Sequence, residues 1–275
     1  MHLIQSVVLG VVQGLTEFLP ISSTAHLRVV PALLGWEDPG VTFSAIIQLG
    51  SVIAVLAYFA RDLVSIATGF FQSVAKKDYT SQDVRIVGAI VLGTIPICVL
   101  GLAFKHLLED EHGPLRQLIV VGVASIVMAI ALFVAEKVGS RTREIKDVGG
   151  RDGLLIGIGQ AMAIIPGCSR SGSTLTAALL LGMKREDAAR FSFLLGIPAL
   201  VLSGLLELKT ALQKGLTGES TSALLVGLAV AAVVSYAAIW WMLKYLRNHS
   251  TVVFIIYRLI FGVAVVALSV NGMIH

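Results

Sequence analysis

The chain has 275 residues, of which 56% are hydrophobic and only 14% are charged, and its mean hydropathy is +0.88. A soluble domain carries roughly 25% charged residues, because polar groups must cover its water-facing surface. The composition therefore excludes soluble enzymes, disordered chains and nucleic-acid-binding proteins, and the net charge of +4 is too small to indicate a nucleic-acid partner. The sequence predicts a polytopic membrane protein.

Six segments are long and apolar enough to cross a bilayer as helices, which takes about 20 residues. The predicted spans are 42–60, 86–104, 117–135, 191–208, 222–243 and 251–271. Four shorter apolar segments cannot span a membrane alone, namely 2–15, 26–34, 153–165 and 174–183. They form two pairs, and a loop rich in Pro, Gly, Ser and Thr interrupts each pair.

Paired short helices with a polar break are typical of re-entrant hairpins, since irregular backbone at membrane depth must be buried in protein or line a wet cavity. Such segments at corresponding places in two halves of a chain point to a binding site at the midplane. Gln13 stands nine residues before Ser22, and Gln160 stands nine residues before Ser169, with a proline ahead of the serines in both cases. The pattern predicts two repeats within one membrane domain, 1–148 and 149–275, each with a hairpin and three spans.

Three spans are an odd number, so the second repeat must be inverted relative to the first. The predicted fold is all-α, an inverted-topology repeat with six transmembrane helices and two re-entrant helical hairpins that enter from opposite sides. Most of the 21 lysines and arginines fall in loops on the side opposite the predicted termini. The positive-inside bias makes that side cytoplasmic and places both termini outside.

The first hairpin loop carries a dense set of polar residues. Gln13 and Glu17 are four residues apart, so they share one helix face, and Pro20 ends that helix. The hydroxyl residues that open the next helix, where they are expected to cap free N–H groups, are Ser22, Ser23 and Thr24. His26 follows in the first turn. Ionisable residues inside a membrane are costly and indicate a functional site.

The residues of the second hairpin loop predict a phosphate-binding site. Gly167 permits a tight turn and a close approach of backbone, and the loop leads into a helix N-terminus, whose free N–H groups and dipole attract anions. Arg170 adds a forked, permanently charged donor that matches phosphate oxygens. The hydroxyl residues beside it are Ser169, Ser171 and Thr174.

Together, the two loops supply a nucleophile, acid–base groups and anion stabilisation, which is the combination that phosphoryl transfer needs. A phosphorylated substrate that meets this site inside a membrane is expected to be a lipid. The competing class is a transporter, either a lipid-carrier flippase or an anion carrier, because inverted repeats with broken helices are also a transporter architecture. A nucleophile beside a base favours the enzyme, because transport needs only an anion site.

Two runs of the sequence resemble the signatures of a known family, the bacterial undecaprenyl-diphosphate phosphatases of the bacitracin-resistance type. They are Gln-Gly-Leu-Thr-Glu-Phe-Leu-Pro-Ile-Ser-Ser-Thr-Ala-His at 13–26 and Pro-Gly-Cys-Ser-Arg-Ser-Gly-Ser-Thr at 166–174. The resemblance extends over nearly the whole chain and implies the same inverted-repeat fold. It implies an enzyme of the bacterial plasma (inner) membrane that hydrolyses undecaprenyl diphosphate to undecaprenyl phosphate and inorganic phosphate.

That reaction recycles the carrier lipid for peptidoglycan synthesis, and with it cell-wall biogenesis and cell shape, and confers resistance to bacitracin. The resemblance further implies a divalent cation as cofactor, Mg²⁺ or Ca²⁺, and an active site that opens to the outer face. The expected partners are a polyprenyl diphosphate lipid and the surrounding membrane lipids, with no nucleic acid. The sequence is compatible with a homodimer.

The resemblance assigns roles to individual residues. Glu17, Ser23, His26 and Arg170 are expected to be catalytic. Glu17 and Gln13 are expected at the metal, and because the family accepts Glu or Gln at the position of Gln13, Glu17 is the main carboxylate here. The residues expected to bind the substrate phosphates are Ser22, Thr24, Gly167, Ser169, Ser171 and Thr174.

Two mechanisms stay open at this point. In one, Ser23 attacks the terminal phosphorus with His26 or Glu17 as general base. In the other, His26 is the nucleophile and forms a phosphohistidine. In both, Arg170 and the loop N–H groups stabilise the transferring phosphoryl group, and a cation held by Glu17 and the diphosphate shields charge.

Two further features carry structural expectations. Arg258 is a charge inside the last predicted span, and we expect it to pair with a carboxylate or to extend its head group to the membrane interface. Glycines four residues apart, at Gly10 and Gly14 and again at Gly153 and Gly157, indicate close helix packing.

Overall fold

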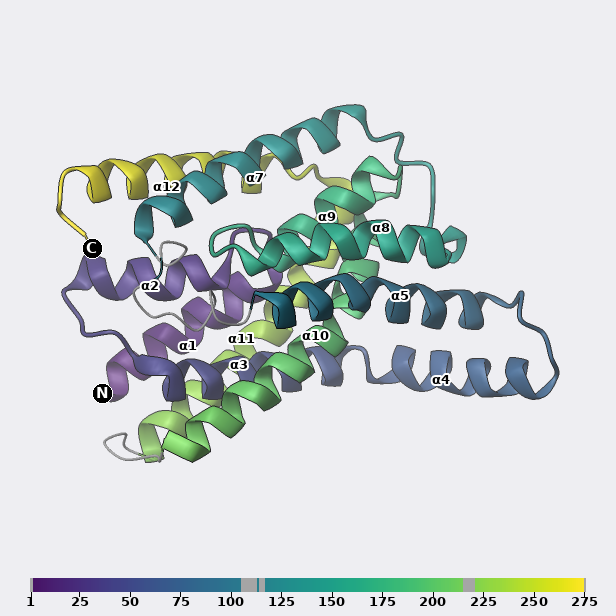
Figure 1. Cartoon of the computed structure of the whole chain (residues 1–275), viewed down its shortest axis with the longest axis horizontal. Coiled ribbons are helices and arrows are strands. Elements are labelled where there is room, and N and C mark those ends of the chain that lie inside the picture. The colour runs from purple at the N-terminus through teal and green to yellow at the C-terminus, as the bar shows by residue number, and fades with distance from the viewer. Residues whose placement is uncertain (1, 105–112, 114–116, 215–220, 275) are drawn as a thin grey trace.

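The computed structural model describes residues 2–104, 113, 117–214 and 221–274, and this part of the chain is built almost wholly of helices (Figure 1). Two one-turn helices, η2 (Ile145–Asp147) and η3 (Met162–Ile164), join the α-helices. The α-helices are α1 (Leu3–Phe18), α2 (Ser23–Leu34), α3 (Gly40–Tyr58), α4 (Ala60–Ala75), α5 (Gln82–Ala103), α7 (Leu118–Val138), α8 (Gly150–Ala161), α9 (Arg170–Leu180), α10 (Arg185–Lys214), α11 (Thr221–Asn248) and α12 (Val252–Val270).

The predicted spans fall on long apolar helices. In the described residues, α5, α7, α10, α11 and α12 are each long and apolar enough to cross a membrane, and α3 with α4 forms a sixth candidate, bent by 62° at its break. The prediction of an all-α polytopic membrane protein is confirmed. Helix α4 was not predicted. It has no buried residue and forms with α5 an arm that projects from one end of the molecule (Figure 1).

The two predicted hairpins are also present as pairs of short helices. Helices α1 and α2 are broken after Phe18, where Leu19 takes an extended conformation ahead of Pro20. Helices α8 and α9 are separated by η3 and a glycine turn at Gly167, whose φ is +97°. Each helix is shorter than the ~20 residues that cross a bilayer, so both hairpins end inside the helical bundle.

Glycines set the closest helix contacts, as their spacing predicted. A Cβ atom on Gly10 of α1 would lie 2.8 Å from the carbonyl oxygen of Gly227 on α11. In the other half, a Cβ atom on Gly157 of α8 would lie 2.2 Å from the carbonyl oxygen of Gly93 on α5. Any larger residue would push the helices apart, so these glycines let polar backbone and short side chains of the hairpins sit deep in the bundle.

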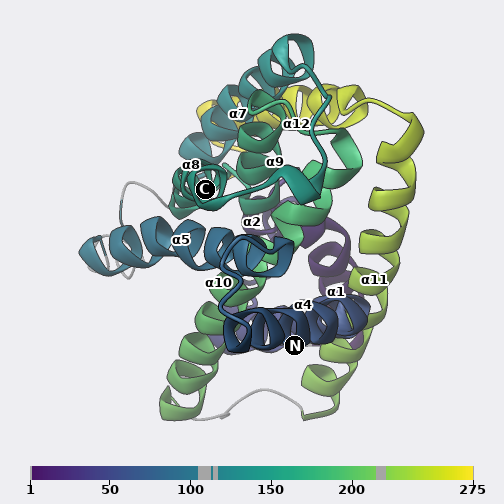
Figure 2. The ribbon, with the colours of Figure 1, turned by 90° about the vertical axis from the view of Figure 1, so that its right-hand side faces the viewer.

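Helix contacts occur in corresponding pairs. Helix α1 packs on α11 and α8 packs on α5, while α3 contacts α10 and α7 contacts α12. Exchanging the two halves of the chain leaves this set of pairs unchanged, as two related halves require, and the inversion of the second half stays a prediction. Figure 2 shows α7 and α12 together along one edge, with α9 between them and α10. The repeat boundary at 148/149 stays a prediction.

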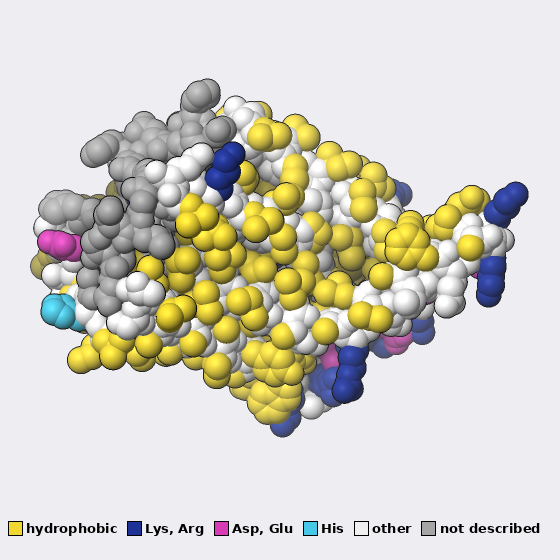
Figure 3. Space-filling view, turned by 90° about the horizontal axis from the view of Figure 1, so that it is seen from below, with side chains coloured by type: hydrophobic (Ala, Val, Ile, Leu, Met, Phe, Trp, Pro, Cys, Tyr) yellow, Lys and Arg dark blue, Asp and Glu magenta, His cyan; other side chains and the backbone are white. Residues whose placement is uncertain are grey.

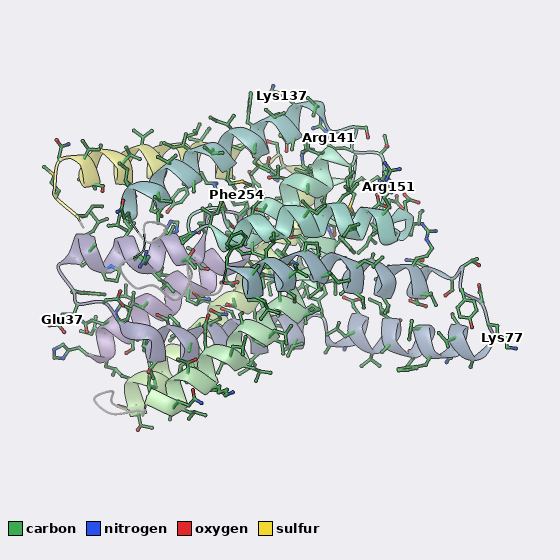
Figure 4. The ribbon with its side chains drawn as sticks, viewed as in Figure 1. Glu37, Lys77, Lys137, Arg141, Arg151 and Phe254 are labelled. Carbon is green, nitrogen blue, oxygen red and sulfur yellow. The ribbon has the colours of Figure 1, made fainter. Side chains whose placement is uncertain are left out.

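Basic side chains are unevenly distributed on the surface. On the face shown in Figure 3, hydrophobic side chains cover the middle, and most of the visible lysines and arginines lie in the half that carries the α4–α5 arm. Lys77 lies at the tip of that arm and Arg151 on the same half, Lys137 and Arg141 lie near the middle of the upper edge, and Glu37 lies at the opposite end (Figure 4). Both ends of the described chain lie at the same end as Glu37 (Figure 1). Lys77 and Arg151 therefore lie away from both ends of the described chain, and the side of the membrane that each end faces stays a prediction.

Candidate active site

The tips of the two hairpins meet, and each second helix starts from a strained turn. Ser22 precedes α2 with a φ of 78°, and Ser169 precedes α9 with a φ of 67°. A left-handed conformation costs a non-glycine residue roughly 1–2 kcal/mol, and such strain gathers at functional sites. The tips are joined directly, because Ser171 Oγ donates to the carbonyl oxygens of Glu17 (3.3 Å) and Leu19 (3.0 Å).

Glu17 is the centre of a hydrogen-bonded cluster that links both hairpins. Its Oε2 accepts from Ser23 Oγ at 2.7 Å and from Gln13 Nε2 at 3.0 Å. Its Oε1 accepts from Arg170 Nη2 at 3.1 Å, and the two side chains are only 9% (Glu17) and 12% (Arg170) exposed. Carboxylate, hydroxyl and guanidinium therefore converge in a largely water-excluded place, where electrostatic interactions are strong.

Neighbouring helices hold this cluster in place. Gln13 Nε2 also donates to Ser51 Oγ on α3 (3.3 Å), and Ser51 in turn shares a hydrogen bond with Ser235 on α11 (2.9 Å). A Cβ atom on Gly196 of α10 would lie 1.5 Å from Arg170 Nη1, so only glycine leaves room for the guanidinium there. Three helices outside the hairpins thus fix the positions of Gln13 and Arg170.

The side chains of Ser22 and Ser169, the serines of the two strained turns, make different hydrogen bonds. Ser22 Oγ hydrogen-bonds to Thr24 Oγ1 (3.1 Å) and makes no cap bond to α2, so the predicted capping by Ser22 is wrong. Ser169 does cap its helix, because its Oγ accepts from the backbone N–H of Gly172 at 3.2 Å. Ser169 also bonds to Ser171 Oγ at 3.2 Å. The hydroxyls expected to bind phosphate are therefore paired with the protein itself and would have to exchange these bonds for substrate oxygens.

Thr174 and Gly167 contribute to the backbone conformation of the second loop. Thr174 Oγ1 donates to the carbonyl oxygen of Arg170 (2.8 Å) and is hydrogen-bonded to Ser192 on α10. A Cβ atom on Gly167 would lie 2.5 Å from the carbonyl oxygen of Val121 on α7. Both residues brace the backbone on which Arg170 stands.

Arg258 clamps the two hairpin tips together. It is 1% exposed, and its Nη1 donates to the carbonyl oxygen of Pro20 (2.8 Å) in the first loop. Its Nη2 donates to the carbonyl oxygens of Gly167 (2.7 Å) and Cys168 (3.2 Å) in the second. The expectation that Arg258 pairs with a carboxylate or reaches the interface is wrong, since loop carbonyls supply its partners.

His26 is buried on α2 and uses both ring nitrogens away from the cluster around Glu17. Nδ1 lies 2.7 Å from the carbonyl oxygen of Ser22, and Nε2 lies 2.6 Å from the hydroxyl of Tyr257 on α12. The ring stacks on Phe261 with centroids 4.3 Å apart. The structure therefore brings Gln13, Glu17, Ser23 and Arg170 together and directs His26 to α12.

Sequence reasoning missed two residues near the site. Glu207 on α10 interacts electrostatically with Glu17, and a carboxylate inside the predicted span 191–208 was the signal that could have found it. Nothing in the sequence singled out Tyr257, because a tyrosine within a membrane span does not by itself indicate a functional site. Its importance comes only from the contact with His26.

The residues at the site fit a cation that is shared with a substrate. Within the described residues, no group of three or more His, Cys, Asp or Glu could hold a metal ion. Mg²⁺ commonly binds through one or two carboxylates together with substrate phosphate oxygens. Glu17 offers the carboxylate in the cluster, so a cation here would need phosphate oxygens as further ligands.

Comparison with known proteins gives one family match and many similar chains. Residues 6–264 match the family described as bacitracin resistance protein BacA. A relative from Gloeobacter violaceus is 54% identical, over 98% of this chain and 93% of its own length. Relatives from Trichormus variabilis (53%, over 100% of this chain and 86% of its own length) and Synechococcus elongatus (49%, over 98% and 93%) are similar to the same extent. All three relatives are named undecaprenyl-diphosphatase.

The match covers most of the first hairpin, the whole second hairpin, five predicted spans in full and the sixth as far as residue 264, and the quoted motifs lie inside it. Identity near one half over almost the full length is far above what a shared fold alone would give. The chain belongs to the bacitracin resistance protein BacA family.

Proposed function

We propose that the chain is an integral-membrane phosphatase that hydrolyses undecaprenyl diphosphate to undecaprenyl phosphate and inorganic phosphate. The observation that carries the proposal is the hydrogen bond of 2.7 Å from Ser23 Oγ to Glu17 Oε2, beside Arg170. A hydroxyl held by a carboxylate is an activated nucleophile, and the arginine is an anion ligand. Full-length relatives with the name undecaprenyl-diphosphatase support the same substrate.

The chemistry follows from this geometry. On binding, Arg170 exchanges Glu17 for an oxygen of the terminal phosphate, which leaves Glu17 free to accept a proton. Ser23 Oγ attacks the terminal phosphorus, its proton passes to Glu17, and the bond from that phosphorus to the bridging oxygen breaks. The lipid monophosphate leaves with the electron pair of that bond. Water then attacks the phosphoserine, the bond from Ser23 Oγ to phosphorus breaks, and Glu17 returns its proton to Ser23 Oγ. Inorganic phosphate is released, and the Ser23 hydroxyl and the Glu17 carboxylate are restored.

The geometry favours Glu17 over His26 as the base for Ser23. Both ring nitrogens of His26 are engaged by Ser22 and Tyr257, whereas Glu17 already accepts the Ser23 hydroxyl. The alternative in which His26 is the nucleophile is decided by trapping the covalent phosphate and mapping its position. A label on Ser23 supports the serine mechanism, and a label on His26 refutes it.

The proposed cofactor is Mg²⁺ or Ca²⁺, held by Glu17, with Gln13 beside it, and by the diphosphate. A cation there would neutralise charge on the phosphate oxygens. Gln13 Nε2 donates to Glu17, so it orients the carboxylate, and its amide oxygen is the atom that could face a cation.

We place the enzyme in the bacterial plasma membrane, with the basic end in the cytoplasm. Most of the lysines and arginines visible in Figure 3 lie in the half that carries the α4–α5 arm, away from the termini, which supports this orientation. Both termini and the opening of the site would then face outward, where a cell-wall carrier lipid is released as its diphosphate. A homodimer stays a prediction.

Phosphate release from undecaprenyl diphosphate in detergent, in the presence of Mg²⁺ or Ca²⁺, tests the proposal. The wild type is expected to release phosphate, and Arg170→Ala and Ser23→Ala are expected to lose at least about 100-fold in kcat. Arg247→Ala, at an exposed ion pair with Glu186, is the matched control and should retain activity. A wild-type protein that releases no phosphate under any of these conditions, yet moves the lipid between leaflets of a vesicle, would refute the phosphatase and favour the flippase.

A further inference from the structure

The two strained turns are held in different ways. At the second hairpin, Ser169 stabilises its own turn, because its side chain caps α9 at Gly172 N. At the first hairpin, Ser22 has the same left-handed conformation, but its side chain makes no cap bond. Something other than Ser22 itself must hold this turn in place, and the turn matters because Ser23 follows it directly.

The imidazole of His26 holds the Ser22 turn. The carbonyl oxygen of Ser22 accepts from the backbone N–H of His26 (3.3 Å) and lies 2.7 Å from Nδ1 of the same residue. A carbonyl oxygen carries no proton, so Nδ1 must be the donor. This contact fixes the tautomer of neutral His26, with the proton on Nδ1 and a lone pair on Nε2. At the corresponding place in the second hairpin stands Ser173, whose ring-free side chain contacts Met128 instead.

Tyr257 fixes the other end of the imidazole. Its hydroxyl lies 2.6 Å from Nε2 of His26, and a neutral Nε2 accepts, so the tyrosine donates. Phe261 stacks on the imidazole with an interplanar angle of 16° and Tyr257 stacks at the same angle, with centroids at 4.3 Å and 5.6 Å. The hydrogen bond sets the rotation of the ring and the stacking sets its plane.

We propose that Tyr257 is a positioning residue for the hydrolysis, acting through His26 on the strained Ser22 turn that presents Ser23 to Glu17. This inference rests on the proposed function. The line of contacts runs from the Tyr257 hydroxyl to Nε2, from Nδ1 to the Ser22 carbonyl, and along the backbone to Ser23, whose Oγ lies 2.7 Å from Glu17. The line ends at a carbonyl oxygen, so it orients Ser23 and transfers no proton to or from it.

Tyr257→Phe is the sharpest test, because it removes one oxygen and keeps the ring that stacks on His26. We expect kcat to fall about tenfold, which is the value of one typical hydrogen bond. KM should stay unchanged, because Arg170 and the second loop are untouched. Tyr236→Phe, a half-exposed tyrosine on α11 that packs on Tyr58, is the matched control and should keep the wild-type kcat.

A double-mutant cycle separates positioning from a general loss of packing. If Tyr257 acts through His26, then Tyr257→Phe should have no further effect on kcat in a His26→Gln background. A structural role alone would lower activity by the same factor in both backgrounds. A wild-type kcat in Tyr257→Phe, or an equal loss in both backgrounds, would overturn the inference.

Nitrogen-15 NMR of the histidine ring gives a readout that does not depend on catalysis. The wild type should show a histidine with the proton on Nδ1 and a hydrogen-bonded Nε2, and Tyr257→Phe should shift the Nε2 signal, because that nitrogen loses its donor. An unchanged Nε2 signal in the variant contradicts the inference even if the wild type hydrolyses the lipid. A wild type that releases no phosphate contradicts the proposed function alone, and the NMR comparison then still decides whether Tyr257 controls His26.

Discussion

Arg258→Lys tests whether a single buried guanidinium holds the two hairpin tips together. Arg258 reaches Pro20 O with Nη1 (2.8 Å) and Gly167 O with Nη2 (2.7 Å). Lysine keeps the charge but presents one nitrogen in place of the fork, so we expect it to keep one of these two bonds. A hydrogen bond to a charged group contributes about 1.5–3 kcal/mol, and the variant should lose stability by about that amount.

Arg258→Lys should also lower the rate of hydrolysis. When one tip is released, the Glu17–Arg170 contact between the hairpins becomes one of several arrangements, and kcat should fall more than tenfold while the protein remains folded. Stability is measured by tryptophan fluorescence in mixed micelles of increasing denaturing detergent, and activity by phosphate release. Arg247→Lys is the control, because its ion pair with Glu186 is 61% exposed on the arginine side and such surface pairs contribute about 0–1 kcal/mol.

An Arg258→Lys protein that unfolds at the wild-type detergent fraction and turns over at the wild-type rate would show that the guanidinium does not hold the hairpin tips together. Loss of stability with an unchanged kcat would show that the clamp supports the fold but does not align the reacting groups. Equal losses in Arg258→Lys and Arg247→Lys would show that the effect comes from the change of residue type and not from the carbonyl contacts.

Three other predictions follow from the packing, the basic end and the cation. Gly157→Ala is expected to destabilise the protein by about 1–3 kcal/mol, because the new Cβ would lie 2.2 Å from the Gly93 carbonyl oxygen; the same micelle unfolding assay measures it. Lys146 and Lys184 lower the pKa of Glu144 from 4.5 to about 2. A lowered carboxyl pKa stabilises the fold fully above the unfolded pKa of 4.5 and loses that effect as the pH falls toward 2. The stability difference between wild type and Glu144→Gln should therefore be constant from pH 7 to pH 5 and shrink below about 4.5. Chelation of divalent cations should lower phosphate release at least about tenfold, and added Mg²⁺ should restore it. Phosphate release that returns without any added cation would contradict the proposal that the enzyme needs a divalent cation.

Hydropathy and spacing were enough to predict an all-α polytopic membrane protein with two pairs of short helices. The spans and hairpins could be found because a helix that crosses the lipid bilayer needs a minimum length and an apolar composition. Both properties are visible in a window of the sequence. Hydropathy did not predict helix α4, because this helix is amphipathic and lies outside the apolar windows, directly after α3. The clustering of Gln13, Glu17 and Ser23 was predictable, since the helix period and the short loop place them at one hairpin tip.

The contacts that hold the tips in place could not be predicted from residue types. Arg258 binds backbone carbonyls of loops that lie 238 and 91 residues away in the chain, and every residue has a carbonyl, so no partner stands out in the sequence. His26 follows Ser23 by three residues and was expected beside it, yet its imidazole turns to α12. The left-handed turn at Ser22 places its carbonyl oxygen within reach of Nδ1 and leaves Nε2 for Tyr257, and a sequence does not reveal such a turn at a serine.

The position of Arg258 and Tyr257 in the last helix also affects the order in which the site is assembled. Membrane proteins are inserted from the N-terminus during synthesis, so α1 and α2 reach the bilayer long before α12 exists. Until α12 arrives, the Pro20 and Gly167 carbonyls lack the guanidinium and His26 lacks its hydroxyl partner. A partly synthesised chain would therefore contain Glu17, Ser23 and Arg170 without their final alignment, and the proposed hydrolysis of the carrier lipid would begin only when the final helix has docked.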